Sequence, residues 1–337
     1  MKRFNKTNRV LAASAASVIA LTSFGGVSVF ADEATTVNIA IQPSSAFTPL
    51  YVVREEGWLE EALADKGVEV VWQDFESGPP MNESLAAGYS DFGVIGDVPT
   101  VSAIAAGQKN YIVATACDAP NSYAMLVSAD SEIEKVEDLK GAKIGTTIGS
   151  TGHNLTDKLL KTVDLDINSD VEVINITTGD AAAVLSNHEV DAVSIWEPNI
   201  TRLVDDGTAK ILATGEDGGL LGVNTIVARQ EFADENPEIV QIVIEQYARA
   251  VSELESIDDE TWARVAEDLS LDGDQLKSIL GKYDYKVTID DNDIENLNDT
   301  IRFLVTIGNL DEEYDIAPYA NKSFVEAADI DQYLSQE

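Results

Sequence analysis

The sequence has few of the residues that form disulfides and most metal sites. Its 337 residues include one cysteine, Cys117, and two histidines. A single thiol excludes an intramolecular disulfide, and a zinc site needs more Cys and His side chains than these. The stretch from Asp164 resembles a calcium-binding loop, but Ser169 and Asn175 replace the glycine and glutamate that such a loop requires. We therefore expect no metal and no cofactor.

Basic residues are also scarce. The 22 Lys and Arg residues stand against 60 Asp and Glu residues, which gives a formal net charge of −38. A surface so negative repels nucleic acid and anionic membranes, so neither is expected as a partner. The carboxylates are expected on solvated helix faces, and they do not by themselves imply a cationic substrate.

Residues 1–31 are typical of a signal peptide. Four basic residues precede the apolar run VLAASAASVIALTSF, and the small residues around Ala31 fit a cleavage site. Within LTSFGG this chain has Phe24 where a lipoprotein would carry its cysteine. We therefore predict an exported protein without a lipid anchor, on the periplasmic or extracellular side of the membrane. Cleavage would leave 18 basic against 60 acidic residues, a net charge of −42.

Two runs of alternating strands and helices follow the signal peptide. Short apolar segments predict strands at 37–41, 68–72, 91–95, 110–116, 123–129, 142–148, 171–176, 192–196, 209–215 and 225–229. After Arg229 the pattern is mostly helical, with an apolar stripe along residues 291–308. The sequence therefore predicts an α/β fold with two lobes, largely parallel sheets and a helical C-terminal tail.

Two strand ends a hundred residues apart repeat one pattern. LAAGYSDFGVIGDVP and LSNHEVDAVSIWEPN each run a short apolar segment into an acidic residue beside a proline, Asp97 or Glu197. Ligands of open α/β sheets bind beyond the carboxyl ends of strands, so the pattern predicts a cleft with an acidic residue on each wall. Either carboxylate could instead only cap a helix. A catalytic acid/base pair, as in glycoside hydrolysis, lacks a neighbour that would divide the two roles.

Short polar groups follow several further strands. In TTIGSTGHNLTDKLL, the start of a helix at Ser150 or Thr151 offers free backbone N–H groups to an anion, although a plain capped helix fits equally well. His153 there could contact a ligand or lie on the surface. The segment SGPPMNESL follows another strand, with prolines that suit a first helical turn. Gln42 and Ser44 could line a pocket or form a tight polar turn.

From about Val37 to Leu254 the chain resembles the solute-binding proteins of ABC importers for alkanesulfonates, taurine and nitrate. The resemblance is carried by the order and spacing of FESGPPMNESLAAGYSDFGVIGDVPTVSAIAAG, VEDLKGAKIGTTIGSTGH, HEVDAVSIWEPNI and VARQEFADENPEIV. It implies a periplasmic-binding-protein fold of type II, with two lobes, a cleft between them and two crossover strands as the hinge. Lobe 1 would comprise residues 36–124 and 225–337, and lobe 2 residues 125–224.

The resemblance also implies where a ligand binds. Carried over residue by residue, the ligand-binding positions are Gln42, Ser44, Ser77, Gly78, Pro79, Gly96, Asp97, Ser150, Thr151, Gly152, His153, Trp196, Glu197 and Asn224. No Lys or Arg falls in these loops. An anion would therefore be held by backbone N–H groups and hydroxyls.

We expect a monomeric, non-enzymatic binding protein that delivers a small sulfonate to a membrane permease. An ammonium group on Asp97 or Glu197 would indicate taurine. Nitrate fits those carboxylates less well, because they would repel it. A thiamine-type pyrimidine precursor, stacked on Trp196, is a further possible solute. An enzyme of this fold, such as a pyrimidine-precursor synthase, is disfavoured by the signal peptide and the lack of a Cys-rich motif.

Overall fold

The computed structural model describes residues 36–334 of the chain. The predicted signal peptide and Phe24 lie outside the described residues. Among the described helices, none has the length and apolar character needed to cross a membrane.

The first sheet has six strands in the order β11-β4-β10-β3-β1-β2. Its strands are β1 (Thr36–Ile41), β2 (Glu69–Asp74), β3 (Phe92–Gly96), β4 (Asn110–Asp118), β10 (Asn224–Arg229) and β11 (Asp284–Thr288). Strands β2 and β3 run parallel to β1, whereas β10 runs antiparallel to both β3 and β4.

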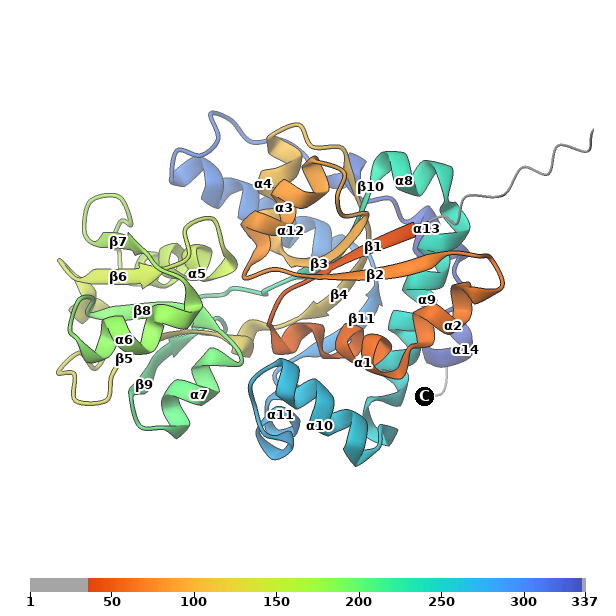
Figure 1. The fold of residues 1–337 in the computed structure, drawn as a ribbon. Helices are drawn as coiled ribbons and strands as arrows, with labels where there is room; N and C mark the ends of the chain where they lie inside the picture. The colour runs from red at the N-terminus through yellow and green to blue at the C-terminus, as the bar shows by residue number, and fades with distance from the viewer. Residues whose placement is uncertain (1–35, 335–337) are drawn as a thin grey trace, which may run out of the picture. The chain divides into compact units, whose positions relative to one another are not determined.

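The second sheet has five strands in the order β7-β6-β8-β5-β9. Its strands are β5 (Tyr123–Ser128), β6 (Lys143–Thr146), β7 (Glu172–Asn175), β8 (Ala192–Trp196) and β9 (Ala209–Thr214). Strand β6 pairs in parallel with β7 and β8, whereas β5 runs antiparallel to β8 and β9. Figure 1 shows this sheet on the left and the first sheet on the right.

The chain crosses between the sheets twice, from β4 to β5 and from β9 to β10. Each strand that follows a crossing is antiparallel to its new neighbours, because it enters the sheet without a crossover helix. The sheets are therefore mixed, and the prediction of largely parallel sheets was too simple. The exact lobe boundaries, 36–124 with 225–337 and 125–224, stay a prediction.

Helices cover both faces of the first sheet. Alternate side chains of β1 serve the two faces, since Val37, Ile39 and Ile41 join one apolar cluster and Ala40 joins the other. The first cluster packs against α1 (Thr48–Glu56), α2 (Trp58–Ala64) and α9 (Pro237–Glu253), and the second against α3 (Gly78–Ala86), α4 (Asp97–Ala105) and α12 (Asp291–Thr306). Gly57 separates α1 from α2 with a φ of 67°, a left-handed conformation that glycine adopts readily at a helix end.

The second sheet is covered in the same way. Helix α5 (Thr151–Lys161) lies on one face, while α6 (Ala181–Ser186) and α7 (Asn199–Asp205) pack on the other. Short 3-10 helices occur at Ser45–Phe47, Pro120–Ser122, Val136–Leu139, Thr178–Asp180, Leu254–Ser256 and Ala317–Tyr319.

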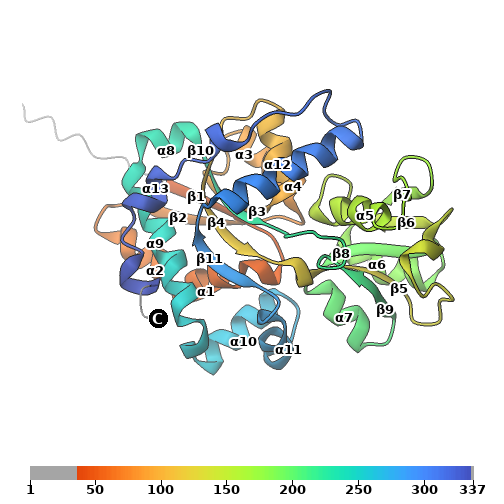
Figure 2. The ribbon, with the colours of Figure 1, turned by 180° about the vertical axis from the view of Figure 1, so that it is seen from behind.

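The C-terminal part is mostly helical, as predicted. It contains α8 (Gln230–Glu235), α9, α10 (Asp259–Asp268), α11 (Gly273–Leu280), α12, α13 (Ser323–Ala327) and α14 (Asp331–Leu334). Figure 2 shows α12 beside α4 and α5. The sequence reasoning missed β11, an edge strand beside β4. Its five residues, DYKVT, alternate polar and apolar side chains as a strand does, so the signal was present but was overlooked in a short segment between two helices.

The sequence repeat corresponds to one local structure built twice. Asp91, just before β3, accepts a hydrogen bond from the backbone N–H of Asn38 at 3.0 Å. Asp191, just before β8, accepts one from the N–H of Lys143 at 2.7 Å. In each sheet the aspartate thus binds the neighbouring parallel strand. The two repeated segments end at the carboxyl ends of β3 and β8, which occupy corresponding places in their sheets.

Candidate functional site

Three helix N-termini meet at one small cavity between the carboxyl ends of the strands. The cavity is lined by Gln42, Ser44, Gly78, Gly96, Pro99, Tyr123, Ser150, Thr151, Trp196 and Asn224. Gly78 is the first residue of α3, Gly96 precedes α4, and Ser150 precedes α5. A helix N-terminus offers unpaired N–H groups and a partial positive charge. The cavity therefore combines three such sources of positive potential.

Close packing explains both glycines in the cavity wall. A Cβ atom on Gly78 would lie 2.5 Å from Cγ of Pro99, and one on Gly96 would lie 2.6 Å from Oγ1 of Thr151. Neither glycine is required by a positive φ. The missing side chains instead let α3 approach α4 and let α5 approach the end of β3.

The lining is polar but uncharged. No residue that lines this cavity in the described part of the chain carries a formal charge. The Tyr123 hydroxyl donates to Oδ1 of Asn224 at 3.3 Å, and the Asn224 amide donates to the carbonyl of Gly222. Oε1 of Gln42 is buried without a hydrogen-bond partner among the described residues. Trp196 contributes an apolar wall.

The inner cavity is narrow, and several residues next to its lining in the sequence line a larger cavity. The volume of the inner cavity in this conformation is about 20 Å³, roughly the room for one water molecule. An outer cavity of about 480 Å³ is lined by residues adjacent in sequence, including Pro43 and Ser77. A sulfonate group, with four heavy atoms, would therefore require the walls of the inner cavity to move apart.

Asp97 points into protein rather than into the cavity. Its Oδ1 accepts hydrogen bonds from Oγ1 of Thr151 at 2.6 Å and from the N–H of Val98, and its Oδ2 accepts from Oγ1 of Thr300 at 2.6 Å. Burial raises the pKa of the Asp97 carboxyl, although these donors oppose the shift. The carboxylate thus joins α4 to α5, which packs on the second sheet, and to α12, which packs with α4 on the first sheet. It is the first residue of α4 and does not cap that helix as an N-cap residue would.

Glu197 is also bound by protein groups. Its carboxylate accepts from the N–H and the hydroxyl of Thr201, each at 3.0 Å, and forms an ion pair with Lys282. The Thr201 contact satisfies the first turn of α7, which agrees with a capping role. Lys282 lies between α11 and β11, so this ion pair links the second lobe to the C-terminal part.

His153 lies in a packing contact. Its ring meets that of Phe303 on α12 edge-on, with centroids 5.2 Å apart. Burial lowers the pKa of His153 to about 4, so the ring is neutral at pH 7. The N–H of His153 donates to Oγ of Ser150, which confirms Ser150 as the cap of α5. The ring does not line the inner cavity.

The remaining predicted residues divide between the two cavities and the surrounding protein. Ser77 lines the outer cavity. Pro79 sits in the first turn of α3. Gly152 packs against the carbonyl of Ser194, where a Cβ would approach to 2.7 Å. The inner cavity thus brings together Gln42, Ser44, Gly78, Gly96, Ser150, Thr151, Trp196 and Asn224, and it adds Pro99 and Tyr123, which the sequence reasoning missed.

The missed residues have weak sequence signals. Pro99 stands two residues after Asp97, where a proline indicates no more than the start of a helix. Tyr123 begins β5 directly after the first crossing between the sheets. Its hydroxyl at that position could have indicated a residue that lines the cavity.

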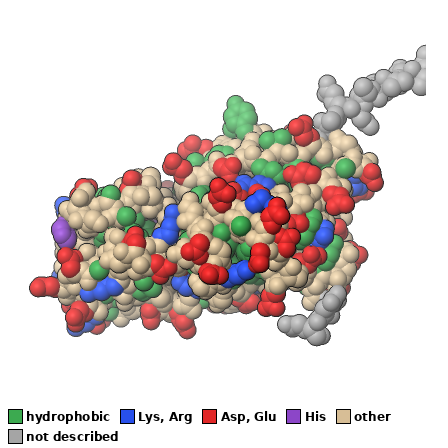
Figure 3. Space-filling model, turned by 60° about the horizontal axis from the view of Figure 1, so that its bottom comes forward, with side chains coloured by type: hydrophobic (Ala, Val, Ile, Leu, Met, Phe, Trp, Pro, Cys, Tyr) green, Lys and Arg blue, Asp and Glu red, His purple; other side chains and the backbone are tan. Residues whose placement is uncertain are grey.

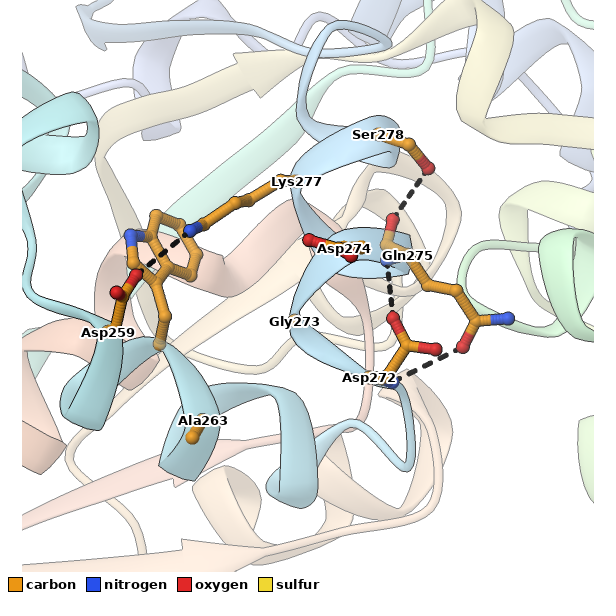
Figure 4. Close-up of a pocket in the computed structure, with 9 residues that line it drawn as sticks. Asp259, Ala263, Asp272, Gly273, Asp274, Gln275, Lys277 and Ser278 are labelled. Carbon is orange, nitrogen blue, oxygen red and sulfur yellow. Dashed lines mark hydrogen bonds and ion pairs between the residues drawn. The ribbon is translucent and has the colours of Figure 1, made fainter.

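A third cavity lies in the C-terminal part. It occupies about 560 Å³ between α10 and α11 (Figure 4). Its polar groups are used locally: Asp272 and Gln275 form a capping box, and Lys277 pairs with Asp259. None of the sequence-predicted ligand-binding residues lines it, so it is not the candidate site.

Acidic side chains are spread over the surface rather than gathered in the candidate site. Figure 3 shows Asp and Glu distributed across the visible face, with fewer Lys and Arg. This agrees with the expectation that most carboxylates are solvated.

Comparison with known protein families shows which family the chain belongs to. Residues 44–256 match the model of the family described as NMT1/THI5 like. The chain belongs to this family. The match spans α1 to α9 and includes every residue that lines the inner cavity except Gln42.

Proteins with similar sequences include named binding proteins. A "Putative aliphatic sulfonates-binding protein" of Bacillus subtilis is 29% identical over 87% of this chain and 87% of its own length. The taurine-binding periplasmic protein of Escherichia coli is 27% identical over 65% of this chain and 67% of its own length. The predicted resemblance is confirmed.

Solved structures confirm the fold. The alkanesulfonate-binding protein SsuA of Xanthomonas axonopodis pv. citri, bound to MOPS, has a TM-score of 0.77 and 26% identity, covering 85% of this chain and 98% of that one. The predicted two-lobed α/β fold with two crossings is therefore confirmed. The desulfurization enzyme DSZB shares the fold alone, with a TM-score of 0.64 at 17% identity and coverage of 87% and 98%.

Proposed function

We propose that this protein is the extracytoplasmic solute-binding component of an ABC importer and that it binds a small sulfonate. The observation that carries the proposal is the convergence of the N-termini of α3, α4 and α5 on an uncharged polar cavity. Each of these N-termini attracts negative charge, and hydroxyl and amide groups supply further donors. A sulfonate presents three acceptor oxygens to such a set of donors.

The two-part cleft also fits an organic sulfonate. Once the cavity walls move apart to admit it, the headgroup would occupy the inner cavity, Trp196 would cover the adjoining carbon, and the rest of the solute would extend toward the outer cavity. The names of the relatives support this class, and MOPS, named with the Xanthomonas protein, is itself an organic sulfonate. Nitrate would use the same donors. It lacks a carbon chain for Trp196, which is why a sulfonate is preferred.

An ammonium contact with Asp97 or Glu197 is not favoured by the geometry. Both carboxylates already accept hydrogen bonds from protein donors, and neither lines the inner cavity. The same contacts argue against a catalytic carboxylate pair. We therefore propose a binding protein without catalytic activity, which releases its solute to a membrane permease.

A thermal-shift screen of the mature protein tests the proposal. The ligands are ethanesulfonate, butanesulfonate, taurine, nitrate and an aminopyrimidine with the ring of thiamine. A solute at 100 times its Kd adds about 2.7 kcal/mol of stability, a readily measured shift. Stabilisation by sulfonates supports the proposal. Stabilisation by the pyrimidine alone would favour a solute whose ring stacks on Trp196, and turnover of any of these compounds would refute a pure binding role.

A further inference from the structure

The outer cavity is lined by residues directly adjacent in sequence to two parts of the inner lining, and it is much larger. Pro43 lies between the inner residues Gln42 and Ser44, and Ser77 directly precedes Gly78. The outer volume is about 480 Å³, against about 20 Å³ inside. The outer cavity is therefore the candidate location for the distal end of a solute longer than its headgroup, and the side chains there would decide which distal group is accepted.

Arg202 is the one cationic side chain that lines the outer cavity in the described part of the chain. It belongs to α7, where its Nη2 donates to Oδ1 of Asn199 at 2.7 Å. Its Nε is enclosed without an acceptor among the described residues. Burial lowers the pKa of Arg202, and the charge of Glu197 offsets this only in part. Asn199 thus orients a guanidinium whose charge is incompletely compensated.

The carboxylates of the outer cavity do not neutralise Arg202. Asp268 forms an ion pair with Arg54, and Asp206 accepts from the N–H of Thr208 at 2.8 Å. Glu76 is exposed and no ion pair joins it to Arg202 among the described residues. The Arg202 guanidinium is therefore the group in this cavity that most needs a further hydrogen-bond acceptor.

We propose that Arg202 is a specificity-determining residue that binds an oxygen-rich distal group, above all a carboxylate, at the end of the solute opposite the sulfonate. This inference rests on the proposed sulfonate function and narrows it to short sulfonates that carry a terminal carboxylate. A guanidinium presents N–H donors in a planar fork that matches the two oxygens of a carboxylate. Leu203 and Leu269 line the same cavity and provide apolar contact for the methylene groups between the two ends.

Titration calorimetry on the mature protein tests the inference. The solutes are sulfoacetate, 3-sulfopropanoate and 4-sulfobutanoate, each compared with the alkanesulfonate of equal carbon number, and taurine. The variants are Arg202→Gln and, as a control with the same change in net charge, Arg302→Gln, an arginine on α12 that pairs with Asp299 and lines neither cavity. Circular dichroism establishes that both variants fold.

At one chain length or more, the unmodified protein should bind the carboxylated sulfonate about tenfold or more tightly than the matched alkanesulfonate. Arg202→Gln should abolish this preference and leave the Kd of the alkanesulfonate within about threefold, whereas Arg302→Gln should keep the preference. Equal affinities at every chain length, a preference that survives Arg202→Gln, or tighter binding of taurine than of every carboxylated sulfonate would overturn the inference while leaving sulfonate binding intact. Failure of the folded protein to bind any of these sulfonates would overturn the proposed function itself.

Discussion

Thr151 donates a hydrogen bond from its Oγ1 to Oδ1 of Asp97 at 2.6 Å, and this bond joins the first turn of α5 to the first residue of α4. Helix α4 packs on the first sheet and α5 on the second. Thr151 also lines the inner cavity. The carboxylate that follows β3 thus holds the opposite wall of the site. The geometry of the site therefore depends on a contact between α4 and α5.

Replacing Thr151 by valine should weaken both folding and binding. Loss of one donor to a buried carboxylate costs about 1–3 kcal/mol of unfolding free energy. Thr300→Val is the matched control, because Thr300 donates to the other oxygen of Asp97 at the same distance of 2.6 Å but does not line the cavity. Urea unfolding should show similar losses for the two variants. Calorimetry should show a larger loss of sulfonate affinity for Thr151→Val, and equal losses of affinity would contradict a direct role for Thr151.

Gly96→Ala should open the site. The new methyl group would lie 2.6 Å from Oγ1 of Thr151, so either α5 or the end of β3 must move. We expect at least a tenfold loss of sulfonate affinity, about 1.4 kcal/mol, because the helix N-termini no longer converge. Gly281→Ala is the control: a methyl group there meets no atom within 4 Å, and neither glycine has a positive φ. An unchanged Kd for Gly96→Ala would show that the two walls need not approach this closely.

The loops of the site are predictable from the sequence, because strand ends and helix starts have local signals. STGH, for example, is correctly predicted to begin a helix. Orientation within a loop was not predictable: Thr151 faces the cavity, Gly152 packs on Ser194, and His153 turns to Phe303. Which of these occurs depends on partners far away in the chain.

The acidic pair shows the same limit. A repeated pattern identifies both residues, and their positions at equivalent strand ends agree with it. Their functions follow from Thr300 and Lys282, which lie 203 and 85 residues away from them along the chain. No local pattern indicates such contacts. The sequence therefore identifies Asp97 and Glu197 as candidates but cannot decide between ligand binding and a structural role.

Glu197→Gln should weaken taurine and ethanesulfonate equally. The Glu197 side chain is fully buried and is occupied by Lys282 and Thr201. The substitution removes the ion pair, which changes how the second lobe meets the C-terminal part, whatever group the solute carries. Calorimetry with both solutes measures the ratio of the two Kd values before and after the change. A selective loss for taurine would restore the ammonium role.

Lys282→Met should cost more stability than Glu197→Gln. It leaves a buried carboxylate without its cation, and breaking a buried pair from one side costs about 3–5 kcal/mol when both groups are enclosed. Because the Lys282 side chain is 30% exposed, we expect a loss near or below the lower end of that range. The double variant should recover part of the loss in urea unfolding. A double variant less stable than Lys282→Met would contradict the pairing.

His153 should make the protein less stable as the pH falls from 7 to 5. Burial depresses the pKa of its ring from 6.5 to about 4. Between these two pH values the His153 ring is therefore mostly protonated in the unfolded chain and mostly neutral in the folded chain. Stability contributed by the neutral ring is complete above pH 6.5, decreases as the pH falls, and decreases no further below about pH 4. Between pH 7 and pH 5 the linkage amounts to about 2 kcal/mol. Urea unfolding at several pH values should show that His153→Gln removes a difference of this size. His188→Asn, which changes an exposed histidine with a φ of 53° to a residue that tolerates that backbone, should leave the pH dependence unchanged. If both variants keep the full pH dependence, the buried ring is not its source.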